Sequence, residues 1–222
     1  MCQRYVVPDQ IAAEREFLPR TAWWKFEPRF NVAPEQYVPA IRMHDGGSEG
    51  VMMRWGLIPS WTEHFPTGKP KWGVRAERAE SGKIYRGAWD GGRRCILPFA
   101  GFYVWQHTPL GHRQPFFVRL MERSVFGVAA LWDRWVSDED DVIESCSLIR
   151  VPANVLLAGI VDPQLAMPAV LRRRHYEAWL SGSASEARAA LQPYPAERMD
   201  AYTVSPRINS RSVDDPGLIS AA

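Results

Sequence analysis

The stretch RCILPFAGFYVWQ, residues 94–106, holds two short strand candidates, Arg94 to Pro98 and Phe102 to Gln106. Both are rich in the branched and aromatic residues that pleated strands favour, and a glycine separates them. The middle of the chain is therefore predicted to be a β-structure of short strands.

Outward from this stretch, the same composition recurs on both sides, broken by Gly and Pro clusters. The further strand candidates are Tyr37 to Met43, Val51 to Trp55, Pro115 to Leu120, Val125 to Leu131 and Val142 to Val151. Helical spacing appears at Pro8 to Leu18, with Asp9 as the N-cap, and then late in the chain, at Asn154 to Ile160, Arg172 to Leu180 and Ser185 to Leu191. The proline-bounded segment Pro28 to Pro34 is predicted to be a loop.

Strands predominate in the middle, helices gather late, and no regular strand–helix alternation occurs. This order predicts an α+β fold of twisted, largely antiparallel, barrel-like sheets with flanking helices. The only linker-like segment, Ser181-Gly182-Ser183, is too short to divide the chain. We therefore expect a single domain over residues 1–222.

Composition excludes several classes of function. The 222 residues contain no run of about 18 apolar residues and no secretory signal, so a cytoplasmic protein without membrane contact is expected. Three cysteines and five histidines are scattered without ligand spacing, so neither a metal site nor a disulfide framework is expected, and no cofactor is predicted. The net charge of +2 does not by itself indicate a nucleic-acid binder, although a local positive stripe would suffice.

Several blocks, in one order along nearly the whole chain, resemble the motifs of one family. They are Met1 to Tyr5 (M-C-G-R-Y in the family), Arg29 to Pro34 (R-Y-N-I-A-P), Met53 to Trp61 (W-G-L-I-P-x-W), Arg75 to Glu77 (the end of N-A-R-A-E), Cys95 to Trp105 (C-L-x-P-x-x-G-F-Y-E-W), Ala130 to Trp132, Ala153-Asn154 and Met167-Pro168. The chain is on this ground similar to the abasic-site processing proteins, also called SOS-response-associated peptidases.

The resemblance implies that Cys2 is the catalytic residue, which captures abasic sites in single-stranded DNA once Met1 is removed. An α-amine has a pKa of about 7.7–8.0, so part of it is a neutral nucleophile that forms an imine with the abasic aldehyde. The neighbouring thiol then closes onto the same carbon as a thiazolidine. An N-terminal cysteine presents both groups at the required separation.

The resemblance also implies DNA-binding residues. These are Arg4, Arg29, Asn31, Pro34, Trp61, Arg75 and Lys83. For Arg29 and Arg75 a structural ion pair is the alternative interpretation. Trp55 is expected in the core, and the run Arg172 to Arg174 is expected to be a solvated helix start.

Three positions depart from the family pattern. The family glutamate, asparagine and histidine correspond to Val104, Gly73 and Val161, and Gln3 replaces a glycine. Because valine transfers no proton and glycine has no side chain to donate, impaired catalysis is expected. Side chains that could substitute are Glu77, Glu80, His107 and Asp162.

Three functions remain open at this point. The first is covalent capture of abasic sites within the DNA damage response. The second is a non-catalytic binder of single-stranded or junction DNA, suggested by the three replaced positions. The third is a thiol peptidase, which follows the family's older name but requires a histidine beside the thiol, where this chain has Val161.

Overall fold

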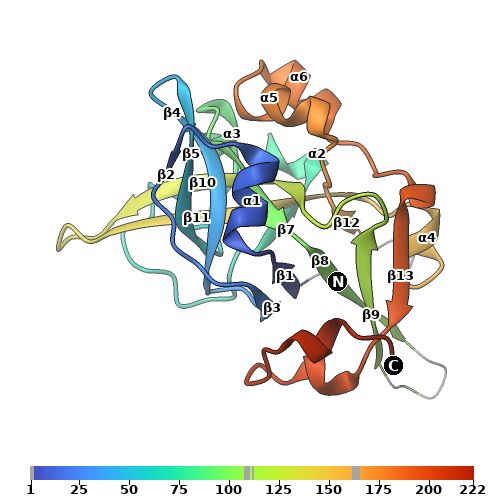
Figure 1. Ribbon diagram of the computed structural model, residues 1–222. Coiled ribbons are helices and arrows are strands. Elements are labelled where there is room, and N and C mark those ends of the chain that lie inside the picture. The colour runs from blue at the N-terminus through green and yellow to red at the C-terminus, as the bar shows by residue number, and fades with distance from the viewer. Residues whose placement is uncertain (1–2, 108–110, 112, 162–165) are drawn as a thin grey trace.

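The computed structural model describes residues 3–107, 111, 113–161 and 166–222 (Figure 1). Two antiparallel systems of strands make up most of it, with helices at their edges. Within the described part of the chain, no helix is long and apolar enough to cross a membrane.

Five strands form a closed barrel. They are β4 (Tyr37–His44), β5 (Gly47–Trp55), β7 (Arg94–Phe99), β10 (Phe126–Val136) and β11 (Val142–Pro152). Antiparallel pairs join β5 to β4, β4 to β7, β7 to β10 and β10 to β11. The ring closes where β11 pairs in parallel with β5, Cys146 opposite Trp55. The predicted α+β fold with largely antiparallel, barrel-like sheets is confirmed.

A second, five-stranded sheet packs beside the barrel in the order β13-β9-β8-β1-β3. Its strands are β1 (Tyr5–Val7), β3 (Arg29–Val32), β8 (Gly101–His107), β9 (Arg113–Leu120) and β13 (Met199–Thr203). Three short strands extend the barrel sheet instead: β2 (Thr21–Ala22), β6 (Gly73–Arg75) and β12 (Ala166–Pro168).

The helices are short and lie around the sheets (Figure 1). They are α1 (Gln10–Phe17), α2 (Ala76–Ala79), α3 (Arg86–Asp90), α4 (Val155–Ala158), α5 (Tyr176–Leu180) and α6 (Ala184–Ala190). Asp9 caps α1 as predicted, because its carboxylate accepts a hydrogen bond from the Ala12 N–H at 3.1 Å. Arg172 to Arg174 are exposed at the turn η1 (Arg173–His175) before α5, the solvated helix start that was expected.

One prediction about local structure is wrong. The segment Pro28 to Pro34 was expected to be a loop, but Arg29–Val32 forms strand β3. It pairs antiparallel with β1 at the edge of the five-stranded sheet, Tyr5 opposite Val32 and Val7 opposite Arg29. The prolines lie outside these pairs, so they limit the strand to four residues without removing a ladder donor from it.

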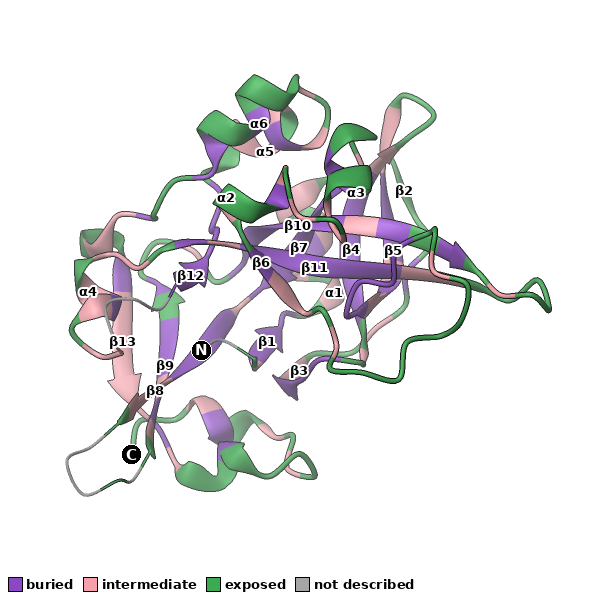
Figure 2. Ribbon diagram, turned by 180° about the vertical axis from the view of Figure 1, so that it is seen from behind, coloured by how far each residue is buried: buried purple, intermediate pink, exposed green. Residues whose placement is uncertain are grey.

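Aromatic side chains fill the space between the barrel and the second sheet. Tyr5 stacks on Phe99 with ring centroids 3.8 Å apart and meets the edge of Trp55 at 5.2 Å. Trp55 is fully buried, as predicted, and its indole N–H donates to the Trp72 carbonyl at 2.8 Å. Figure 2 shows the strands that carry these side chains, β1, β5 and β7, as buried over most of their length.

The C-terminal segment covers the outer face of the second sheet. After β13 it forms two short 3-10 turns, η3 (Pro206–Asn209) and η4 (Pro216–Ile219). A small second core lies beneath it, made of Val6, Tyr103, Phe117, Val204, Ile208 and Leu218. In Figures 1 and 2 this segment lies next to β1, β3 and β9.

Candidate functional site

The chain that follows Cys2 forms an inner strand of the second sheet, between β8 and β3, while Cys2 itself lies outside the described residues. Tyr5 pairs with Phe102 of β8 and with Val32 of β3. The carbonyl of Arg4 accepts a hydrogen bond from the Tyr103 N–H at 3.1 Å. The backbone at Arg4 therefore has one defined place, at the start of β1.

Positive charge gathers at this place. Arg4 is half-buried and donates through Nη1 to the Gln3 carbonyl at 2.9 Å. Burial lowers the pKa of Arg4, and the positive charge of Arg211 lowers it further. Arg211 was not among the residues predicted from the sequence.

The side chains of Arg29, Asn31 and Pro34 hold the segment around β3 in place. Arg29 Nε lies 3.1 Å from an Asp214 carboxylate oxygen, and its Nη2 donates to Gln36 Oε1 at 3.1 Å. Asn31 is buried and donates through Nδ2 to the carbonyls of the C-terminal segment, while Pro34 is also buried. Arg29 therefore forms a structural ion pair, which was the alternative interpretation. Its binding to DNA stays a prediction.

Trp61 and Lys83, two residues predicted to bind DNA, come together in space. Trp61 is 55% exposed, and Lys83 Nζ lies 5.3 Å from the centroid of a ring of its indole. Trp61 belongs to the long connection between β5 and β6, whereas Lys83 lies between α2 and α3. An exposed aromatic ring beside a cation is the arrangement on which a nucleic-acid base stacks next to its phosphate.

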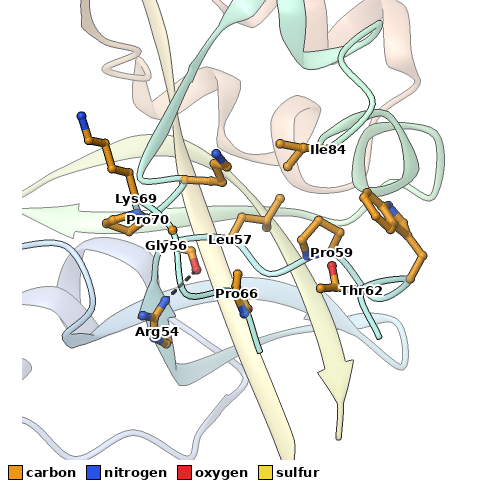
Figure 3. Close-up of a pocket in the computed structure, with 12 residues that line it drawn as sticks. Arg54, Gly56, Leu57, Pro59, Thr62, Pro66, Lys69, Pro70 and Ile84 are labelled. Atoms are coloured by element: carbon orange, nitrogen blue, oxygen red, sulfur yellow. Dashed lines mark hydrogen bonds between the residues drawn. The ribbon is translucent and has the colours of Figure 1, made fainter. Parts of the chain in front are cut away.

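A pocket of about 220 Å³ opens beside this pair, lined by Trp61 itself (Figure 3). Apolar side chains make most of its wall: Leu57, Pro59, Pro66, Pro70 and Ile84. Three cations also line it: Arg54, Lys69 and Lys71. These residues were not predicted as site residues. The two lysines of Lys69-Pro70-Lys71, which follow Trp61 closely in the sequence, could have indicated positive charge beside it.

Hydrogen bonds fix the connection that carries Trp61. The Leu57 N–H donates to the Lys71 carbonyl at 3.2 Å and closes its base. Its tip is held by Asp133, which accepts from the Ser60 N–H at 3.0 Å, and by the Trp135 indole, which donates to the Thr62 carbonyl at 2.6 Å. The backbone on both sides of Trp61 is therefore held in place before any ligand binds, which lowers the entropic cost of ordering this connection on binding.

Gly73 and Arg75 lie in β6, which pairs in parallel with β11. Arg75 is exposed, opposite Arg150. A Cβ atom at Gly73 would lie only 3.3 Å from Arg150 Nε, and the Arg150 guanidinium carbon lies 4.9 Å from a ring centroid of Trp72. The space directly beside Gly73 is therefore taken by the side chain of Arg150.

Unlike Gly73, the positions Val104 and Val161 lie in apolar surroundings. Val104 is 4% exposed and belongs to the main core, and Val161 is half-buried against the same core. Among the proposed substitutes, Glu80 forms an ion pair with Arg188, and Glu77 and His107 are exposed. The fourth, Asp162, lies outside the described residues.

No metal site emerges from the described residues, since they bring together no group of three His, Cys, Asp or Glu that could hold an ion. Cys95 and Cys146 are fully buried, and burial raises the pKa of both thiols. Neither buried thiol is therefore a nucleophile at neutral pH.

The model of the family described as SOS response associated peptidase (SRAP) matches residues 1–211. The chain belongs to the SRAP family. Its relatives include the abasic site processing protein YoqW of Bacillus subtilis (strain 168), 30% identical over 210 residues that cover 93% of this chain and 90% of that protein. The abasic site processing protein HMCES of Rattus norvegicus is 25% identical over 236 residues, covering 89% of this chain and 66% of that protein.

Solved structures with a similar fold agree with this assignment. A protein from Bacteroides thetaiotaomicron matches with a TM-score of 0.79 and 27% identity, covering 87% of this chain and 85% of its own. A protein from Bordetella bronchiseptica matches with a TM-score of 0.79 and 25% identity, covering 92% of this chain and all of its own (100%). The relatives named above connect the SRAP family with the processing of abasic sites in DNA.

Proposed function

We propose that this SRAP chain binds single-stranded DNA and captures abasic sites covalently through Cys2. The observation that carries the proposal is the pairing of exposed Trp61 with Lys83 beside an apolar, cation-lined pocket. It occurs in a chain whose relatives are named for abasic-site processing. The target is accordingly DNA that contains an abasic site.

The pocket suits unpaired DNA. A base that is free of its partner strand can stack on the indole of Trp61, and stacking of this kind tolerates any base. Lys83 and the pocket cations Lys69 and Lys71 supply positive charge for the phosphates on either side. Recognition that depends on stacking and charge fits a lesion that has lost its own base.

The chemistry requires only the two nucleophiles of an N-terminal cysteine. The Cys2 amine adds to the C1′ aldehyde of the opened abasic sugar and releases one water as the imine forms. The Cys2 sulfur then bonds to the same carbon, its proton passes to the imine nitrogen, and a thiazolidine results. No oxidant or reductant is consumed, so the adduct has the combined mass of protein and DNA less one water.

The surroundings of Val104, Gly73 and Val161 bear on the rate of this reaction. A positioned acid or base contributes roughly 10²–10⁴-fold, and none of these three side chains can transfer a proton. We expect the adduct to form slowly and, without proton transfer to reopen the ring, to persist.

Binding of single-stranded DNA without chemistry is the second candidate. It is favoured by the burial of Val104 in the main core, where the family has its glutamate. This alternative keeps the role of Trp61 and Lys83 and gives Cys2 none.

A single pair of variants separates the two candidates. Met1-processed protein is incubated with a single-stranded oligonucleotide that carries one abasic site, and adducts are resolved on a denaturing gel. We expect a slow-forming adduct with the wild type and with Cys95→Ala, which removes a buried thiol, and none with Cys2→Ala. Equal binding by all three proteins without any adduct would support the non-catalytic candidate, and no DNA binding at low salt would exclude both.

A further inference from the structure

The C-terminal segment returns to the beginning of the chain and is fixed there on both sides of Arg211. Asn31 Nδ2 donates to the Ser210 carbonyl at 2.8 Å and to the Val213 carbonyl at 2.7 Å. The Asp214 carboxylate accepts from the Asn31 N–H at 3.0 Å. The backbone that carries Arg211 is thereby anchored against β3.

Strand β3 in turn lies beside β1, with Val32 opposite Tyr5. Anchoring residues 210–214 to Asn31 therefore brings Arg211 toward Arg4, the residue directly before Tyr5. Figures 1 and 2 both show the C-terminal segment next to β1 and β3. The positive charge of Arg211 also reaches Arg4 strongly enough to lower the pKa of that guanidinium.

The arginines of the C-terminal segment and of β3 differ in whether a carboxylate pairs with them. The neighbouring arginines have carboxylate partners, Arg29 with Asp214 at 3.1 Å and Arg207 with Asp215 at 2.6 Å. Arg211 is exposed and takes part in no ion pair between described residues. Two guanidinium groups close enough to repel each other gain most from a shared anion, and guanidinium binds the oxygens of a phosphate in a bidentate manner.

We propose that Arg211 joins Arg4 in binding one phosphodiester of the DNA backbone beside the N-terminus. This inference rests on the proposed function, since it names a further residue that holds the DNA. Arg4 is separated from Cys2 by a single residue, so a phosphate bound here belongs to the nucleotides next to the lesion. The C-terminal segment thus takes part in binding and not only in covering the sheet.

The test uses unmodified single-stranded DNA, so that it depends on binding and not on chemistry. Fluorescence anisotropy gives Kd at several salt concentrations for the wild type, Arg211→Ala, Arg211→Lys and Arg174→Ala. Arg174 is an exposed arginine at η1, before α5, and its replacement removes the same charge away from β1.

We expect Arg211→Ala to weaken binding several-fold and to reduce the slope of log K against log salt by about 0.7, the value for one phosphate contact on a single strand. Arg211→Lys restores the slope because the charge returns, and Arg174→Ala leaves it as in the wild type. All variants should unfold at the wild-type temperature, because both arginines are exposed.

Two results would overturn the inference while the proposed function stands. The first is an Arg211→Ala variant with the Kd and the salt slope of the wild type. The second is an equal change of Kd and salt slope in Arg211→Ala and Arg174→Ala. A further arm adds inorganic phosphate at constant ionic strength. If phosphate displaces DNA from the wild type more readily than from Arg211→Ala, the two ligands share this pair of arginines, as the inference requires. Phosphate binding that depends on Arg211 but leaves the Kd for DNA unchanged would make the pair a site for free phosphate instead. Absence of wild-type binding would contradict the proposed function itself, and the inference with it.

Discussion

Arg29 and Asp214 form an ion pair of 3.1 Å although 185 positions separate them in the sequence. The same carboxylate accepts hydrogen bonds from the N–H groups of Phe30 at 2.5 Å and Asn31 at 3.0 Å. One residue near the C-terminus therefore satisfies three donors of the strand that precedes Pro34. The shape of this predicted DNA-binding segment depends on the C-terminal segment.

Replacing Asp214 tests that dependence. Asp214→Ala leaves two backbone donors without their acceptor and should lower the free energy of unfolding by about 2–4 kcal/mol. Asp214→Asn keeps an acceptor oxygen and should cost less than half as much. Urea denaturation measures both.

The control for Asp214 is Asp200→Ala, which breaks an exposed ion pair with Arg119 at 3.0 Å and should cost less than about 1 kcal/mol. Equal losses for Asp214→Ala and Asp200→Ala would mean that Asp214 does not organise the strand.

Trp61→Ala should weaken binding of single-stranded DNA by about 1–3 kcal/mol, because a base loses the ring on which it stacks. The stability of the protein should change little, since the side chain is 55% exposed. Trp23→Ala is the matched control, as Trp23 is 74% exposed and lies outside the pocket. Comparable losses of DNA affinity in the two variants, measured by anisotropy, would argue against a specific platform at Trp61.

Gly73 and Arg150 should behave as one unit. Gly73→Asn places its Cβ about 3.3 Å from Arg150 Nε and should cost about 1–3 kcal/mol through overpacking. In an Arg150→Ala background the same change should cost much less, because the space is vacated. A double-mutant cycle by denaturation measures the coupling, and strictly additive losses would contradict it.

The stability of the protein should fall above about pH 8.5. Burial raises the pKa of Cys95 and Cys146, so the folded state keeps both thiol protons while the unfolded state loses them above the ordinary thiol pKa of about 8.5. The stabilising effect is complete below that pH and is lost as the pH rises, by up to about 1.4 kcal/mol per pH unit for each thiol.

Cys146→Ala removes one of these titrations. The urea midpoint of this variant should therefore decline less steeply than that of the wild type between pH 8 and pH 9.5, with reductant present. Parallel curves for the two proteins would show that the Cys146 thiol ionises alike in both states.

Much of the fold could be predicted from the sequence because its strands are locally distinctive. Val, Ile, Phe and Trp mark the barrel strands, and Gly and Pro end them, so the predicted ranges fall within a few residues of β4, β5, β7, β10 and β11. Asp9 and Asn154 mark helix starts for the same local reason, since their side chains cap backbone N–H groups. A single domain over residues 1–222 stays a prediction.

The strands and side-chain contacts that depend on tertiary structure were missed. Strand β3 exists because β1 offers it an edge, and its own sequence, flanked by prolines, favours a loop. The pocket cations and Arg211 acquire a role only when segments distant in sequence meet. The resemblance indicated Trp61 and Lys83 separately, but only the structure brings them together.

The most direct test of the central proposal is the intact mass of the protein after incubation with abasic single-stranded DNA. Mass spectrometry first establishes that Met1 has been removed and Cys2 is N-terminal. We predict a species heavier by the oligonucleotide less one water, stable to denaturation and absent in Cys2→Ala. An unchanged protein mass, with Cys2 N-terminal and DNA binding intact, would contradict covalent capture and leave this SRAP chain a binder of single-stranded DNA.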